Sequence, residues 1–398
     1  MGKKTKKTKA SILLVISTLI VMLLGITGCG KLSRGTNVDK LLDTEYKKTA
    51  YNFIKLYNDN NIDEIRNTNS DLKYMSNEEI TELIKSNYNS DNLLILSDSN
   101  YKLSQVLDET PDSSIIHSVK FVFCLKSKAD KSSEQSVVVQ VNKNGNISFE
   151  KGSTNIIKDV KIMLPYEVNA VINNVALGNE LRTKSDAENS KDTYIIPYLA
   201  SNVEFVYNSE TFGKLVSKVN IPTDTSDKNY GKADVKFALS DKDITDVLKA
   251  SKTMFNEMFD NYSEGVTKDT DYEKYVDDGN KELTKVMQNS VNQALKNQGT
   301  YTSHKNTDMM VSILAASDKV EPAIYIYNAS DEVVVNAKVQ KTWLYKLINW
   351  DKSSNFYSSF RVKKDNSNKN GTGYVVTFLN TNGDNILNSC NNFVTDWR

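Results

Sequence analysis

Hydrophobic positions recur with a helical period at two places in the first part of the chain. Residues 77–88 predict one helix, with Asn77 as the N-cap and with Glu78 and Glu79 in the first turn, where acidic side chains are favourable. Residues 44–58 predict another, because one face carries five apolar or aromatic side chains: Tyr46, Ala50, Phe53, Ile54 and Tyr57. Both helices are therefore expected to bury one face against a core.

Strand patterns follow these two helices. Short apolar runs bounded by turn residues predict strands over residues 93–97, 101–107, 115–127, 135–141 and 146–150. The last two are joined by Asn142-Lys143-Asn144-Gly145, which is typical of a hairpin turn. Helices first and an antiparallel sheet afterwards is an α+β order.

The helical period disappears between residues 159 and 238. Strands are predicted over residues 158–164, 167–172, 174–177, 193–198, 202–207, 213–221 and 232–238, with turns at Asn173-Asn174 and in the polar segment 182–192. Many short strands separated by turns predict a small all-β, sandwich-like domain.

The last part of the chain returns to helices followed by strands. Apolar faces predict helices over residues 241–262 and 282–296, and strands are predicted over residues 310–315, 323–327, 332–348, 356–362 and 373–379. We therefore expect an α+β protein made of a leader (1–28), a tether (29–43), an α+β domain (44–158), a β-domain (159–238) and a second α+β domain (239–398).

The first 28 residues have the parts of a secretory signal peptide. The apolar run over residues 12–24 is about 13 residues long, too short to span a hydrocarbon core of roughly 30 Å at 1.5 Å per residue. Five lysines precede it: Lys3, Lys4, Lys6, Lys7 and Lys9. A positive head before a short apolar run predicts export.

The segment Ile26-Thr27-Gly28-Cys29 directly follows this run and resembles the lipobox of bacterial lipoproteins. The resemblance implies cleavage after Gly28, a diacylglycerol on the Cys29 thiol and further acylation (palmitate). It places the body on the extracellular face of the cell membrane, held by lipid, since each buried CH₂ contributes about 0.8 kcal/mol to membrane binding. The alternative is a plain N-terminal transmembrane anchor with an incidental cysteine; both put the body outside.

The order of helix, helix and bent antiparallel sheet resembles the cone of NTF2-like domains, which occur in Gram-positive envelope proteins as binding or spacer modules. Residues 160–169, the Asn173-Asn174 turn and Tyr194-Ile195-Ile196-Pro197-Tyr198 resemble the small β-domain of the teicoplanin-resistance-associated membrane protein family. That family places such a β-domain before an NTF2-like C-terminal domain, so the resemblance covers residues 159–398. Its zinc ribbon and transmembrane helix are replaced here by the lipobox, which confines any shared role to the envelope.

Charge gives no reason to expect nucleic acid. Lys and Arg together number 50, as do Asp and Glu, and the five leader lysines leave 45 basic residues after the cleavage site. A mildly acidic body lacks the basic excess that phosphate binding requires.

The sequence contains no recognisable catalytic motif, and we expect no enzyme, no metal and no cofactor. Its two histidines, His117 and His304, have no partner nearby in sequence and are expected at structural or surface positions. An acidic segment from Asp269 to Asp278 would need glycine and glutamate where Lys274 and Asn280 stand to form a calcium loop, so solvated acids are expected.

Two cysteines remain after Cys29. Cys124 lies in an apolar strand and is expected to be a small buried thiol; a disulfide with Cys390 is the alternative in an exported chain.

Aromatic residues gather in two consecutive strands near the C-terminus. We consider Trp343, Tyr345, Trp350 and Tyr357 a candidate ligand surface, because aromatic faces stack on sugars and peptides. Core and cross-strand packing is the alternative. The strands are expected to be joined by a tight connection over residues 351–355.

The sequence favours a non-enzymatic, membrane-anchored envelope lipoprotein that binds a wall polymer or an envelope protein partner. Two alternatives stay open. An envelope enzyme would use an NTF2-like pocket, and a solute-binding lipoprotein of a transporter would need two lobes with alternating strands and helices.

Overall fold

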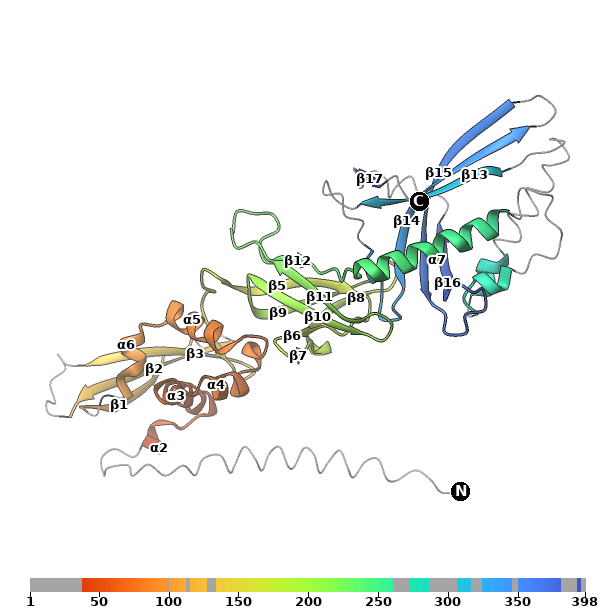
Figure 1. The fold of residues 1–398 in the computed structure, drawn as a ribbon. Coiled ribbons are helices and arrows are strands. Elements are labelled where there is room, and N and C mark those ends of the chain that lie inside the picture. The colour runs from red at the N-terminus through yellow and green to blue at the C-terminus, as the bar shows by residue number, and fades with distance from the viewer. Residues whose placement is uncertain are drawn as a thin grey trace, which may run out of the picture.

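The computed structural model describes residues 38–96, 98, 100–111, 115–126, 134–260, 272–278, 280–285, 306–315, 324–345, 350–380 and 392–394. These residues form three units that follow one another in a row (Figure 1): a first unit (38–150), a middle unit (156–238) and a third unit (239–394). The first and third combine helices with an antiparallel sheet and the middle unit is built of strands, so the fold is α+β, as predicted.

The first unit begins with short and medium-length helices. They are α2 (Val38–Leu41), α3 (Glu45–Asn58), α4 (Ile62–Thr68), η1 (Ser70–Leu72), α5 (Asn77–Asn87), α6 (Ser90–Leu93) and η2 (Leu94–Leu96). The predictions of α3 and α5 are confirmed. The predicted cap of α5 is wrong: Ser76 is the N-cap and forms a capping box with Glu79.

The predicted strand over residues 93–97 is also wrong, because residues 93–96 lie in α6 and η2. Its Leu93 and Ile95 are buried, and the Asn58 side chain of α3 donates a hydrogen bond to the Leu93 carbonyl at 2.6 Å. A short apolar run suits a buried strand and a buried helical turn equally, and packing against α3 decides between them.

The first sheet has the strand order β1-β2-β3-β4 among the described residues. Its strands are β1 (Tyr101–Asp108), β2 (Ile116–Leu125), β3 (Gln135–Asn142) and β4 (Ile147–Ser148), all paired antiparallel. Val119, Phe121 and Phe123 alternate on the face that packs against the helices. The turn between β3 and β4 is the predicted one, with Gly145 at a φ of 79°.

The middle unit consists of two sheets that share one core. One has the order β12-β5-β9-β8 and the other the order β11-β10-β6-β7. The strands are β5 (Ile156–Pro165), β6 (Val171–Ile172), β7 (Val175–Ala176), β8 (Arg182–Asp186), β9 (Lys191–Ala200), β10 (Asn202–Ser209), β11 (Gly213–Asn220) and β12 (Lys232–Asp234), with the 3₁₀ turn η4 (Asn179–Leu181).

Part of the segment 182–192, predicted as a polar turn, is the strand β8, which pairs antiparallel with β9. This strand has no apolar pattern, because all five of its side chains are charged or contain a hydroxyl and none is buried. An edge strand gains its backbone hydrogen bonds from one neighbour and does not need an apolar face.

The third unit places helix α7 (Asp241–Asp260) beside a sheet of order β16-β15-β14-β13-β17 (Figure 1). Its strands are β13 (Asn306–Ala315), β14 (Val333–Tyr345), β15 (Trp350–Lys364), β16 (Tyr374–Asn380) and β17 (Asn392–Val394), and η5 spans Tyr272–Tyr275. Of the helix predicted over residues 282–296, residues up to 285 are helical and the rest lie outside the described residues.

Two strand predictions in this unit need correction. Residues 351–355, expected as a connection, lie inside β15, which pairs with β14 without interruption from Trp350 to Val362. Of the strand predicted over residues 323–327, the described residues 324–327 form only isolated bridges, from Tyr325 to Ala238 and from Ile326 to Val333. The sequence did not predict a strand at residues 351–355 because their side chains are polar. The backbone hydrogen bonds of the β14–β15 hairpin tolerate polar residues on both faces.

Candidate functional site

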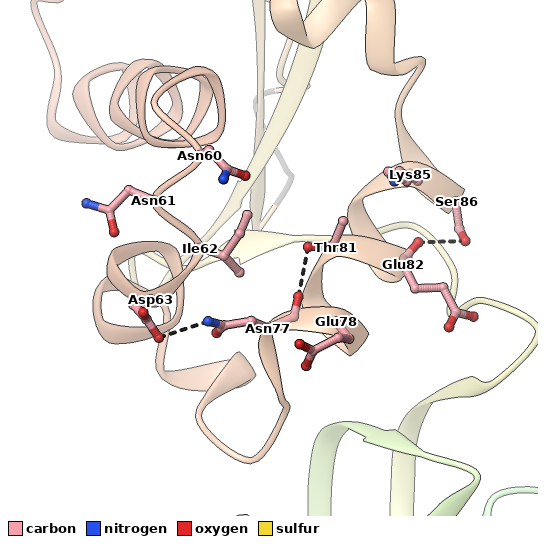
Figure 2. A pocket seen from close by; sticks show the side chains of 10 residues that line it. All are labelled: Asn60, Asn61, Ile62, Asp63, Asn77, Glu78, Thr81, Glu82, Lys85 and Ser86. Carbon is pink, nitrogen blue, oxygen red and sulfur yellow. Dashed lines mark hydrogen bonds between the residues drawn. The ribbon is translucent and has the colours of Figure 1, made fainter.

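An open polar groove lies on the surface of the first unit. It has a volume of about 690 Å³ and lies between the start of α4 and the outward face of α5 (Figure 2). Ten residues line it: Asn60, Asn61, Ile62, Asp63, Asn77, Glu78, Thr81, Glu82, Lys85 and Ser86. Sequence reasoning missed this groove because it did not predict α4, which forms one wall.

Hydrogen bonds hold the two walls of the groove in place. Asp63 of α4 accepts from the Asn77 amide of α5 at 3.1 Å and from the Arg66 guanidinium at 2.6 Å. On the other side, Glu82 accepts from the Ser153 hydroxyl at 2.6 Å. Two of the three lining carboxylates are therefore already engaged within the protein.

The lining of the groove consists almost entirely of hydrogen-bonding side chains. Nine of its ten described lining residues are polar, none is aromatic, and three carboxylates face one lysine. Such a surface suits a polar ligand bound through amides and hydroxyls, and it is unsuited to a polyanion.

A second cluster of titratable side chains lies where α3 meets the sheet. The Tyr46 hydroxyl donates to the Asp108 carboxylate, and the Tyr46 ring stacks on His117 with centroids 4.1 Å apart. Burial raises the pKa of Asp108, but hydrogen bonds from Thr110 and Tyr46 outweigh it and hold this pKa below its ordinary value. The same hydrogen bond raises the pKa of Tyr46.

The cluster pins α3 to β1 and β2, and His117 takes the structural position expected of it. Its buried Nδ1 has no hydrogen-bond partner among the described residues. Leaving such an atom unpaired costs stability, and the stacked tyrosine ring partly offsets this. His304 lies outside the described residues.

The four aromatic positions proposed as a ligand surface divide between the two faces of the β14–β15 hairpin. Tyr345 pairs with Trp350 in the register, and Trp343 lies two residues before Tyr345, so these three positions share one face. Tyr357 pairs with Lys338 and lies on the opposite face. The hairpin therefore brings together three of the four positions.

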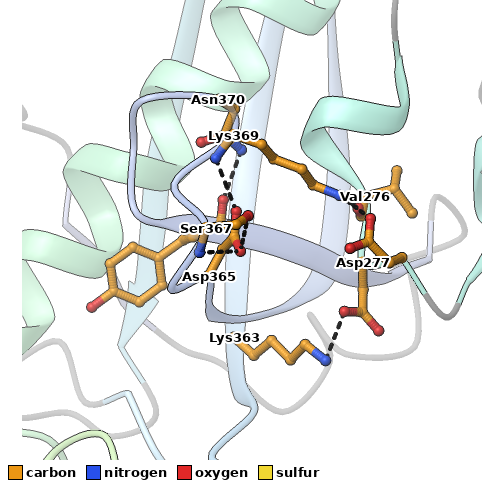
Figure 3. A network of polar contacts seen from close by, with 9 residues as sticks. Val276, Asp277, Lys363, Asp365, Ser367, Lys369 and Asn370 are labelled. Atoms are coloured by element: carbon orange, nitrogen blue, oxygen red, sulfur yellow. Dashed lines mark hydrogen bonds and ion pairs between the residues drawn. The ribbon is translucent and has the colours of Figure 1, made fainter.

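The acidic segment of the third unit is neutralised by lysines (Figure 3). Asp277 pairs with Lys363 at 2.7 Å, and the Lys369 ammonium bonds Asp278 and the Val276 carbonyl. These two acids are ion-paired and not merely solvated, and lysine ammonium groups stand beside them where a calcium site would require oxygen atoms. Asp269 and Asp271 lie outside the described residues.

No group of three or more His, Cys, Asp or Glu side chains that could hold a metal ion occurs in the part of the chain that the structure describes. Gly28 and Cys29, the predicted cleavage and lipidation residues, lie outside that part. Cys124 is half-buried on β2, so the expectation of a buried thiol is wrong. Cys390 lies outside the described residues, and a disulfide between the two stays the untested alternative. None of the described helices is long and apolar enough to cross a membrane.

Comparison with known proteins gives no family assignment: no protein-family model matches the chain, and no curated protein sequence matches it.

Proposed function

We propose that the chain is a non-enzymatic lipoprotein of the cell envelope, anchored through a diacylglycerol on Cys29, which binds a wall polymer or an envelope protein partner. The observation that carries this proposal is the segment Ile26-Thr27-Gly28-Cys29 directly after a short apolar run and a lysine-rich head. Two acyl chains suffice for stable anchoring where one does not.

The arrangement of the units supports a binding role at a distance from the membrane. The third unit lies at the opposite end of the row from the first unit, which follows the tether (Figure 1). The order of helices followed by an antiparallel sheet in both end units supports the NTF2-like expectation, and the strands of the middle unit support the resemblance to the teicoplanin-resistance-associated family.

The anchor is tested by replacing Cys29 with serine in the full-length chain and growing cells with labelled palmitate. We expect the wild-type protein to be labelled and to sediment with membranes, and Cys29→Ser to lose the label. Cys124→Ser is the matched control and should keep it. An unlabelled wild-type protein would rule out the lipid anchor.

The binding surface is tested with a photoreactive residue placed at position 350 or 357, on opposite faces of one hairpin. Recurrent capture of one envelope protein or wall fragment from position 350, with little from position 357, supports the aromatic face that contains Trp343, Tyr345 and Trp350. Equal capture from both positions, or none from either, argues against this face and directs the search to the groove of the first unit.

A further inference from the structure

We infer that the three units form one rigid strut, so that the third unit is held at a set position and orientation relative to the first. If the lipid anchor proposed above is correct, the strut also holds the third unit at a set distance from the membrane. The rigidity of the strut does not depend on the anchor. Units joined by a small or polar contact normally move relative to one another. Both junctions of this chain are built differently.

At the first junction the two units exchange tyrosines. Tyr74 comes from the first unit but is 1% exposed and belongs to the core of the middle and third units. Its hydroxyl accepts the Gly178 amide at 2.9 Å, and its carbonyl accepts the Asn173 side chain at 2.8 Å. The β6–β7 hairpin and the turn after it are therefore hydrogen-bonded to the segment before α5.

Tyr198 makes the reciprocal contact. It comes from β9 of the middle unit, is 3% exposed and belongs to the core of the first unit. Its hydroxyl bonds both the amide and the carbonyl of Phe149 at 3.1 Å, and its ring meets the Phe149 ring edge-on, with centroids 5.7 Å apart. Separating the units would expose both tyrosines and leave their polar partners unpaired.

The link between these units is itself held to the body. Glu82 of α5 accepts hydrogen bonds from Ser153 at 2.6 Å and from Asn155 at 3.3 Å. Gly152 lies so close to the Ile156 carbonyl that an added Cβ would approach its oxygen to 2.0 Å. The link is therefore a folded part of the junction and not a free tether.

At the second junction, backbone pairing and a continuous core replace side-chain exchange. The Ile326 amide donates to the Phe237 carbonyl at 3.0 Å, and the Ala329 amide donates to the Tyr166 carbonyl at 3.0 Å. Asp331, 4% exposed, accepts the Tyr207 hydroxyl and the Thr211 amide, each at 2.9 Å. One hydrophobic cluster runs from the middle unit into the third.

Two consequences follow. The protein does not capture a ligand by closing its end units around it, because neither junction offers a hinge. It presents its third unit as a fixed platform, and a partner must meet it in that orientation.

The test measures distances between spin labels in the full-length chain, with Cys29→Ser, Cys124→Ser and Cys390→Ser to remove every native thiol. Labels replace the exposed lysines Lys55, Lys218 and Lys364, one in each unit. We expect one narrow distance distribution for the pair 55–218 and one for the pair 218–364. A broad or multiple distribution for either pair would overturn the strut.

The contribution of the two tyrosines to the rigidity of the first junction is tested by the double variant Tyr74→Ala with Tyr198→Ala. This variant should broaden the distance distribution of the pair 55–218 and leave that of the pair 218–364 narrow. Tyr88→Ala, which truncates an aromatic packed within the first unit against Phe53 and Phe149, is the control and should leave both distributions narrow.

If the double variant unfolds the first unit, Tyr198→Phe with Tyr74→Phe keeps the rings and should broaden the 55–218 distribution modestly. No broadening in any folded variant would overturn the role of the tyrosines. Because the labelled chain carries Cys29→Ser, these distances do not depend on the lipid anchor, so a failed anchor and a failed strut are separate results.

Discussion

The two junctions reach the same rigidity by different physical means. The first depends on a few side chains, chiefly Tyr74 and Tyr198, each inserted into the other unit's core. The second distributes its stabilisation over backbone hydrogen bonds, one buried carboxylate and a continuous apolar core. A junction made of few large side chains is more sensitive to single substitutions than a distributed one, since backbone bonds survive the loss of any one side chain.

The largest effect is expected from Tyr198→Ala. Removing a buried aromatic ring leaves a cavity and unpairs Phe149, which should lower the free energy of unfolding by about 4 kcal/mol. Urea unfolding followed by circular dichroism measures it. A loss below about 1 kcal/mol would contradict the assignment of Tyr198 as a main support of the first junction.

Asp331→Ala should be the most damaging single change at the second junction. It removes the acceptor of the Thr211 amide, leaves the Tyr207 hydroxyl only the longer 3.4 Å contact with the Ala329 carbonyl, and puts alanine at a φ of 56°, for a loss of about 2–3 kcal/mol. All three tryptophans lie at or beyond position 343, so tryptophan fluorescence reports unfolding of the third unit. Asp331→Asn keeps one acceptor and tolerates this backbone, and should cost less; equal losses would contradict the assigned role of the carboxylate.

Tyr198→Phe separates the ring from its hydroxyl. We expect a loss of about 1 kcal/mol, because the core contact stays while the Phe149 amide and carbonyl lose a partner. The same urea titration is run on both variants, and the difference between the losses of Tyr198→Ala and Tyr198→Phe gives the free energy contributed by packing of the ring. Similar losses for both variants would show that the hydroxyl and not the ring holds the first junction.

The smallest effect is expected at the rim of the first junction, where Lys73 pairs with Glu180. Glu180→Gln should cost at most about 0.5 kcal/mol, because the pair is exposed and screened by salt. The Lys73 ammonium lowers the pKa of the Glu180 carboxyl. The contribution of the Lys73–Glu180 pair to the free energy of unfolding is therefore present above the unfolded-state pKa of Glu180. It is lost as the pH falls through the lower folded-state pKa. An unchanged pH dependence of stability in Glu180→Gln would contradict it.

Local patterns predicted the elements whose side chains alternate strongly. The helices α3 and α5 and the strands β1, β2 and β3 follow from their apolar periods. The failures were segments whose structure depends on a neighbour: residues 93–96 are helical because they pack on α3, and β8 is a strand because β9 offers backbone partners. The groove was missed for the same reason, since α4 is seven residues long and too short for a clear period.

The sequence by itself determined the α+β order of the chain and predicted its lipid anchor, because helical periods, strand alternation and a lipobox are written in neighbouring residues. It also located the aromatic positions of the β14–β15 hairpin, but register alone assigned Tyr357 to the other face. Only the tertiary structure decided how the units are joined. Tyr74 meets Gly178, and Tyr207 meets Asp331, across more than a hundred residues of chain, and contacts at that separation have no local signature.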